Sequence, residues 1–109
     1  MKRDIMLFIQ DIKESIQNIE DFSKNLDKEN FSKNKLRQSA VIRQLEIIGE
    51  AVKNIPSSFK EDFPKIPWKE IAGFRDVLSH AYFGVNISRV WNIIEFDLPN
   101  LKQEIDKIN

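Results

Sequence analysis

"RQLEIIGEAVKNIP", residues 43–56, has apolar residues at helical spacing and decides the fold class. The apolar residues recur every three or four positions, beginning two residues before the quoted stretch: Val41, Leu45, Ile48, Val52 and Ile55. This spacing places them on one stripe of an α-helix. Pro56 ends the helix, because the residue before a proline is disfavoured in the helical region. We therefore expect an amphipathic helix that buries this stripe.

Gly49 and Glu50 interrupt the apolar character of this helix. Glycine inside a helix costs about 1 kcal/mol relative to alanine, so we expect another helix to approach closely at Gly49. Glu50 also forms an i, i+4 pair with Glu46. Such a pair is usually a solvated face and less often part of a metal site, and we favour the solvated face.

The N-terminal segment shows the same periodicity and predicts a helix from about residue 3 to residue 26. Its stripe consists of Ile5, Ile9, Ile12, Ile16, Ile19, Phe22 and Leu26. The polar stretch that follows, DKENFSKNK (residues 27–35), is expected to be a connector. Ser32 is its candidate N-cap for the next helix.

Residues 56–67, PSSFKEDFPKIP, form the longest irregular connection, in which FKEDF can make one helical turn capped by Ser57 or Ser58. Pro67 suits the start of a third helix, WKEIAGFRDVLSH, because proline is tolerated in the first turn. Gly84 and Asn86 mark the turn after it. The residues expected to face inward on the third helix are Trp68, Ile71, Leu78 and either Phe74 or Val77.

A fourth helix is predicted by a stripe that Pro99 interrupts: Ile87, Val90, Trp91, Ile94, Leu98, Leu101, Ile105 and Ile108. Proline removes a backbone hydrogen bond and clashes with the preceding turn, so we expect a kink near residues 96–99 or a break with Asp97 as a new N-cap. The fold class is thus all-α, an up-and-down bundle of four main helices in a single domain over residues 1–109.

Composition excludes several classes of function. The chain has no cysteine, hence no disulfide or thiolate metal site, and the cytoplasm is the expected compartment. No apolar run is long enough for a membrane span, and the N-terminal MKRDIMLFIQDIKE does not read as a secretory signal. Seventeen basic residues balance seventeen acidic ones, so any contact with nucleic acid must be local.

Two further groups of residues have ordinary interpretations. The basic cluster Lys33, Lys35 and Arg37 can contact phosphate, but a hydrated connector is the favoured interpretation because few aromatic residues are interleaved with it. Trp68 and Trp91 lie on apolar stripes and are expected in the core or an interface. Glycine-rich phosphate loops, G-x-S-x-G elbows and histidine pairs for a metal are absent from the sequence.

The stretch FRDVLSHAYFG, residues 74–84, contains the only histidine, His80, between Arg75 and Tyr82. Arginine presents a charged donor fork suited to phosphate and histidine transfers protons near neutral pH, so together they suit a phosphodiester. On a helix their five-residue separation puts them about 140° apart. They converge only if the helix ends near His80 or a second chain completes the site. Alternatively, His80 is a helix-end residue paired with Asp76, one turn earlier.

FRDVLSHAYFG resembles the Arg-x-x-x-x-His-x-Tyr motif of HEPN-domain ribonucleases, specifically the HepT-like family that is paired with minimal nucleotidyltransferases. RQLEIIGEAVKNIP is similar to that family's second long helix and IPWKEIAGFRDVLSH to its motif helix, so the resemblance covers nearly the whole chain. Many relatives have asparagine after the arginine, where this chain has Asp76. An aspartate there adds unfavourable charge unless it orients His80 or Arg75.

The resemblance implies a metal-independent endoribonuclease with an RNA substrate, no metal and no cofactor, acting as a toxin. Arg75 would stabilise the phosphorane and His80 would transfer protons, in a homodimer or an oligomer of dimers whose motif helices meet. Tyr82 would position RNA or accept AMP from a cognate nucleotidyltransferase antitoxin that silences the toxin. The alternative is a non-catalytic HEPN interaction module that binds the transferase or its nucleotide.

Overall fold

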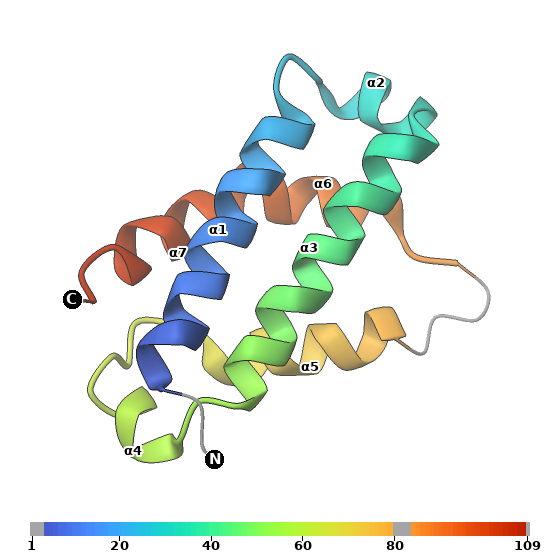
Figure 1. The fold of residues 1–109 in the computed structure, drawn as a ribbon. Coiled ribbons are helices and arrows are strands. Elements are labelled where there is room, and N and C mark those ends of the chain that lie inside the picture. Colours follow the sequence, from blue (N-terminus) through green and yellow to red (C-terminus); the bar gives the residue numbers. More distant parts are fainter. Residues whose placement is uncertain (1–3, 80–83, 109) are drawn as a thin grey trace.

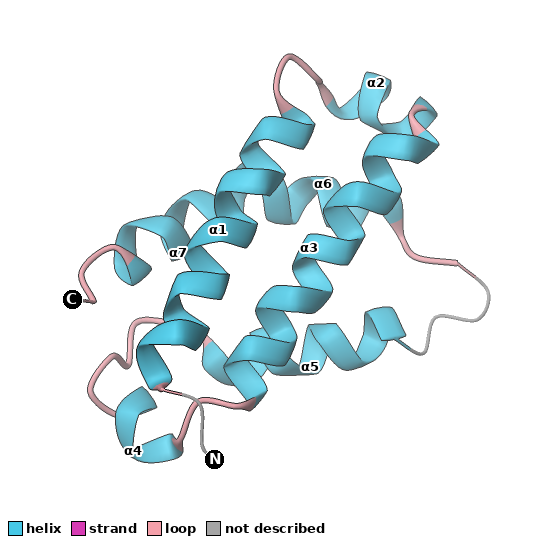
Figure 2. Ribbon diagram, viewed as in Figure 1, coloured by secondary structure: helices cyan, strands magenta, loops and turns pink. Residues whose placement is uncertain are grey.

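The computed structural model describes residues 4–79 and 84–108, and every regular element in these two ranges is helical (Figures 1 and 2). The elements are α1 (Ile5–Ser23), α2 (Lys28–Lys33), α3 (Lys35–Lys53), α4 (Ser57–Lys60), α5 (Trp68–Ser79), α6 (Ile87–Asn92), the π-helical segment η1 (Ile93–Asp97) and α7 (Leu98–Ile105). The prediction of an all-α bundle is confirmed. No helix within the described ranges is long and apolar enough to cross a membrane.

The two long helices α1 and α3 lie side by side and form one layer of the molecule (Figure 1). Their predicted stripes are buried, with Ile12 and Ile19 of α1 and Val41 of α3 at most 1% exposed. Asn18 donates a side-chain hydrogen bond to Gln44 at 3.2 Å and joins the polar edges of the two helices. The apolar periodicity therefore predicted the core of this layer correctly.

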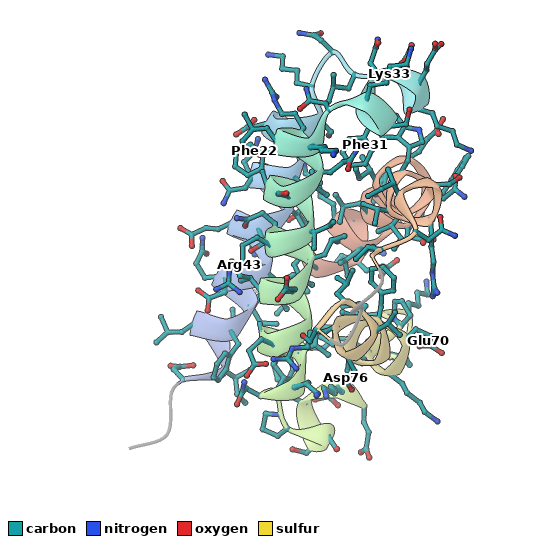
Figure 3. The ribbon with its side chains drawn as sticks, turned by 90° about the vertical axis from the view of Figure 1, so that its right-hand side faces the viewer. Phe22, Phe31, Lys33, Arg43, Glu70 and Asp76 are labelled. Carbon is teal, nitrogen blue, oxygen red and sulfur yellow. The ribbon has the colours of Figure 1, made fainter. Side chains whose placement is uncertain are left out.

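The second layer consists of α5 together with α6, η1 and α7. Figure 3 shows α5 and α6 nearly end-on beside α3, so these helices cross the first layer. α5 packs against α3, and α7 packs against α1, where Lys102 binds Glu20 at 2.9 Å. The crossing of α3 and α5 determines the surroundings of Arg75.

The predicted connector over residues 27–35 is wrong, because most of it forms α2. The side chain of Asp27 accepts a hydrogen bond from the backbone N–H of Asn30 at 2.7 Å and caps this helix. Phe31 is fully buried and its ring lies 5.4 Å from that of Trp91, which fixes α2 to the second layer. One apolar residue gives no periodicity, so the pattern along the sequence did not reveal this helix.

The predicted helix boundaries around this connector also need correction. Ser32 is not an N-cap: it lies inside α2 and donates to the carbonyl of Glu29 at 2.6 Å. The N-cap of α3 is Asn34, whose side chain accepts from the backbone N–H of Arg37 at 3.0 Å. α1 ends at Ser23 rather than at residue 26, and Asn25, with φ 65°, takes the chain out of the helix.

The expected irregularity near Pro99 takes the form of a π-helical segment rather than a break. Leu98 donates its N–H to the carbonyl of Ile93, five residues earlier, so the backbone is widened over η1 immediately before Pro99. Proline leaves a carbonyl of the preceding turn without its usual donor, and a π turn accommodates this loss. Asp97 stands at the N-cap position of α7 but makes no side-chain capping bond.

The third predicted helix is confirmed as α5. Of the two alternatives for its inward face, Phe74 is partly buried against the core, whereas Val77 is 53% exposed. Trp68 and Trp91 are both buried, as expected, and their indole N–H groups bond to the carbonyl of Phe63 and the carboxylate of Glu95. Before α5, residues Ser57–Lys60 form the short helix α4, without a side-chain cap.

Candidate functional site around Arg75

Two of the four predicted site residues, Arg75 and Asp76, lie near the C-terminal end of α5. The other two, His80 and Tyr82, lie outside the described residues. The structure therefore shows what holds Arg75 and Asp76, while the position of His80 relative to them stays a prediction.

Gly49 is the point at which α5 crosses α3, as the unusual mid-helix glycine predicted. A Cβ built on Gly49 would overlap the Cβ of Arg75 and lie 2.6 Å from its Cγ. Real Cβ atoms do not approach so closely, so only glycine permits this packing. The aliphatic part of the Arg75 side chain consequently packs on the backbone of α3. This contact fixes the point from which the guanidinium group extends.

The guanidinium group of Arg75 is bound by two carboxylates. Its Nη2 lies 3.0 Å from Oε2 of Glu50, on the turn of α3 beside Gly49, and its Nη1 lies 3.5 Å from Oδ1 of Asp76. The Arg75 side chain is 28% exposed, so it remains accessible from solvent. Its Nε is buried and has no hydrogen-bond partner among the described residues.

Asp76 is bound more closely by Lys53 than by Arg75. Lys53, at the end of α3, places its Nζ 2.6 Å from Oδ1 of Asp76 on α5; Asp76 is labelled in Figure 3. The hydrogen bond from Lys53 lowers the pKa of the Asp76 carboxyl below its usual value, and Arg75 adds to the effect. Asp76 is therefore a carboxylate at neutral pH, with its charge directed toward α3.

A small hollow of about 170 Å³ lies beside Arg75, between α1 and α3. Its lining mixes charges and contains Phe8, Asp11, Arg43, Glu46, Ile47, Glu50, Ala51, Asn54 and Arg75. Its three carboxylates, Asp11, Glu46 and Glu50, outnumber its two arginines, so it is not a basic strip. Across residues 4–79 and 84–108, the structure contains no group of three His, Asp or Glu side chains placed to hold a metal ion.

A second hollow, of about 650 Å³, does not include Arg75 in its lining. It lies between α3, α5 and the last helices, and its walls include Ile48, Ile71, Phe74 and Leu101. Arg89 covers part of it, with its guanidinium carbon 4.8 Å from the centre of the Phe74 ring. Apolar core residues and polar residues share its lining about evenly, and the polar ones include Lys65, Glu70, Arg89 and Glu104, so its charges are mixed as well.

The favoured interpretation of the basic cluster as a hydrated connector is wrong, because Lys33 lies in α2 and Lys35 and Arg37 lie in α3. Lys33 pairs with Glu29 at 3.1 Å on the exposed surface. Arg37 donates to the backbone carbonyl of Phe22 at 2.8 Å and so ties α3 to the end of α1. These contacts give the two residues structural partners.

Sequence reasoning missed two members of the Arg75 cluster. Glu50 was expected on a solvated face; it is 56% exposed, but it also binds Arg75. Lys53 was not singled out at all. The sequence contained one indication of these contacts, the spacing of Gly49, Glu50 and Lys53. Residues three apart, such as Glu50 and Lys53, share a helix face, and Gly49 beside them marks where α3 meets another helix.

Comparison with known proteins identifies relatives over nearly the whole chain. A family model described as "Ribonuclease HepT-like" matches residues 12–108. The chain is 49% identical over 107 residues to "Putative RNase MJ1216" of Methanocaldococcus jannaschii, covering 98% of this chain and 88% of that protein. It is 48% identical over 108 residues to "Probable ribonuclease HepT" of Thermococcus cleftensis, covering 99% of this chain and 98% of that protein.

A third relative is longer. The chain is 45% identical over 108 residues to "Gamma-glutamylcyclotransferase and putative RNase MJ0434" of Methanocaldococcus jannaschii. It spans 49% of that relative's length, so the match concerns about half of that protein. No solved structure matches the chain at a significant level.

Proposed function

The chain belongs to the HepT-like ribonuclease family, and from this premise we propose that it is a metal-independent endoribonuclease acting through Arg75 and His80. The observation that carries the proposal is the way in which neighbouring residues hold the Arg75 side chain. The aliphatic part of the Arg75 side chain is fixed against Gly49, and the side chain as a whole stays partly exposed. Its guanidinium group is therefore suited to bind the phosphodiester of RNA.

The chemistry needs no cofactor. One imidazole removes the proton from a ribose 2′-hydroxyl, and the 2′-oxygen attacks phosphorus. The bond from phosphorus to the 5′-oxygen breaks, and a second imidazole protonates that leaving oxygen. Arg75 stabilises the charge that develops on the non-bridging oxygens. The products are a 2′,3′-cyclic phosphate and a 5′-hydroxyl end.

This mechanism uses two histidines, whereas the chain contains one. We propose a homodimer, or an oligomer of such dimers, in which the motif helices of two chains meet and each supplies an Arg75 and a His80. Val77 supports a contact between chains on α5, because its apolar side chain is 53% exposed on a face of that helix away from Arg75. Light scattering at micromolar concentration tests it, and a monomer would contradict the composite site.

The proposal also includes regulation in the cytoplasm as the toxin of a toxin–antitoxin pair. Tyr82 either positions RNA or accepts AMP from a cognate nucleotidyltransferase antitoxin. An anionic adduct near Arg75 would exclude an RNA phosphate by occupancy and by charge. Co-expression with the transferase, followed by intact-mass measurement, should show an increase that Tyr82→Phe abolishes. An unchanged mass of the wild-type chain would contradict this part.

One observation favours a second candidate, a non-catalytic HEPN module that binds the transferase or its nucleotide. The described surroundings of Arg75 contain Glu50 and Asp76 instead of a basic strip, and the net charge of the chain is zero. An enzyme that cuts long RNA usually carries an electrostatic footprint.

Cleavage by Arg75 variants separates the two candidates. In the endoribonuclease, Arg75→Lys keeps the charge but loses the planar fork, so cleavage of labelled RNA should fall by about tenfold or more. Arg75→Ala should reduce it further. Wild-type protein that cuts none of several RNA classes would favour the binding module.

A further inference from the structure

The inference concerns Lys53, which the proposed mechanism does not use, and it rests on the proposed ribonuclease function. Asp76 directly follows the arginine that is to bind phosphate. A carboxylate at that position competes with an RNA phosphate for the arginine N–H groups, since both are anions that accept from the same fork. The chain must therefore keep the Asp76 carboxylate from occupying Arg75.

The distances from the Asp76 carboxylate to Lys53 and to Arg75 show how the carboxylate is kept away from the arginine. Lys53 and Arg75 approach the same oxygen, Oδ1 of Asp76, but Nζ of Lys53 lies at 2.6 Å and Nη1 of Arg75 at 3.5 Å. A charge-assisted hydrogen bond is usually shorter than 3 Å, and contacts near 3.5 Å are weak. Of these two cations, Lys53 therefore makes the stronger contact with the Asp76 carboxylate.

The other contacts around Arg75 are consistent with an Asp76 carboxylate that is held more closely by Lys53 than by Arg75. Glu50 contacts Nη2 of Arg75 at 3.0 Å, whereas Nη1 has the longer contact, at 3.5 Å to Asp76. Lys53 comes from α3 and Asp76 from α5, and the Gly49 crossing brings them together. The Lys53 and Asp76 side chains are 39% and 48% exposed, so the pair is accessible from solvent.

We infer that Lys53 is a positioning residue: it holds the Asp76 carboxylate toward α3 and thereby leaves the Nη1 edge of Arg75 available to an RNA phosphate. Loss of Lys53 removes the 2.6 Å contact toward α3, and we expect the carboxylate then to contact Arg75 more closely and to compete with the phosphate. Lys53 therefore acts through Asp76, and its effect disappears when residue 76 carries no charge.

The experiment measures binding of a fluorescent RNA oligonucleotide methylated at every 2′-oxygen, which lacks the attacking hydroxyl. The full chain is used as wild type, Lys53→Met, Lys53→Arg, Asp76→Asn and Lys53→Met with Asp76→Asn. We expect Lys53→Met to weaken binding by about tenfold in the presence of Asp76 and by no more than about threefold in the Asp76→Asn background. Lys53→Arg should stay within about twofold of wild type, because arginine also binds the carboxylate.

Lys33→Met is the matched control, because Lys33 is also a surface lysine paired with a carboxylate, on α2. It should change binding by less than about twofold, which separates local positioning from the loss of one positive charge. An equal loss from Lys53→Met in both Asp76 backgrounds would overturn the inference, as would no loss in either. If the wild type binds no RNA at all, the proposed ribonuclease function itself is wrong, a result distinct from the failure of Lys53.

Discussion

The Cβ of Arg75 occupies the space that a Cβ on Gly49 would need. This contact places the arginine of the motif helix directly on the backbone of α3, between the carboxylate of Glu50 and that of Asp76. The position of the proposed catalytic arginine is thus set by a glycine twenty-six residues earlier in the chain.

Gly49→Ala should therefore destabilise the protein. Alanine is favoured over glycine inside an isolated helix, but here its methyl group meets the first atoms of the Arg75 side chain, which cannot move without α5. We expect the free energy of unfolding to fall by about 1–3 kcal/mol, measured by urea denaturation. RNA cleavage at a temperature where the variant is folded should fall as well, because Arg75 is displaced.

Gly73→Ala is the matched control for this substitution. Gly73 lies inside α5, and nothing lies within 4 Å of a Cβ built there. Its replacement should raise the free energy of unfolding by about 0.5–1 kcal/mol through helix propensity alone. Equal effects of the two alanine variants would contradict the account of the helix crossing.

Glu50→Gln should tighten RNA binding. The carboxylate of Glu50 and an RNA phosphate compete for Nη2 of Arg75, and glutamine competes less well because it is uncharged. We expect an increase in affinity of about threefold and a change in stability below about 1 kcal/mol, since the pair is partly exposed. Glu29→Gln, which removes a surface carboxylate from α2, is the control. Weaker binding by Glu50→Gln would show that Glu50 assists phosphate binding instead.

The pH dependence of the free energy of unfolding should reveal the ion pair between Asp76 and Lys53. The pKa of Asp76 is lowered in the folded chain from its ordinary value of 3.8, mainly by the hydrogen bond from Lys53. A lowered pKa stabilises the fold above the unfolded value and loses that contribution as the pH falls through the folded value. Urea denaturation from about pH 5 to about pH 2.5 should therefore show a shallower loss of stability in Asp76→Asn than in wild type. Parallel pH profiles would contradict the lowered pKa.

Phe31→Ala tests whether α2 is part of the core. Phe31 is fully buried and packs on Trp91, so its truncation should cost about 3–5 kcal/mol of unfolding free energy. Leu36→Ala, at a residue that is 78% exposed, should change stability by less than about 0.5 kcal/mol. A small effect of Phe31→Ala would mean that α2 behaves as the connector expected from its polar sequence.

The long helices could be predicted because their stripes repeat over several turns. α2 could not, because Asp27 and Phe31 are too few to form a periodic pattern. Pro99 indicated an irregularity, yet whether it became a kink, a break or a π turn depended on how α6 and α7 pack on the core. Local patterns thus predicted elements, and tertiary packing decided their ends.

The candidate site was predictable to a similar extent. Gly49 indicated a close helix approach, and that prediction is confirmed, but spacing cannot show that the approaching residue is Arg75. The contacts of Glu50 and Lys53 depend on the relative rotation of α3 and α5, which a sequence pattern does not contain. The convergence of Arg75 and His80 stays a prediction, since His80 lies outside the described residues.

The most direct test of the central claim is cleavage of labelled RNA in the presence of a metal chelator, by purified wild-type protein and by His80→Ala. Intact-mass measurement of both samples ensures that Tyr82 is unmodified. We predict cleavage by the wild type, with 2′,3′-cyclic phosphate ends, and its loss in His80→Ala. Cleavage that survives in His80→Ala, or that the chelator abolishes in the wild type, would contradict a metal-independent ribonuclease centred on Arg75 and His80.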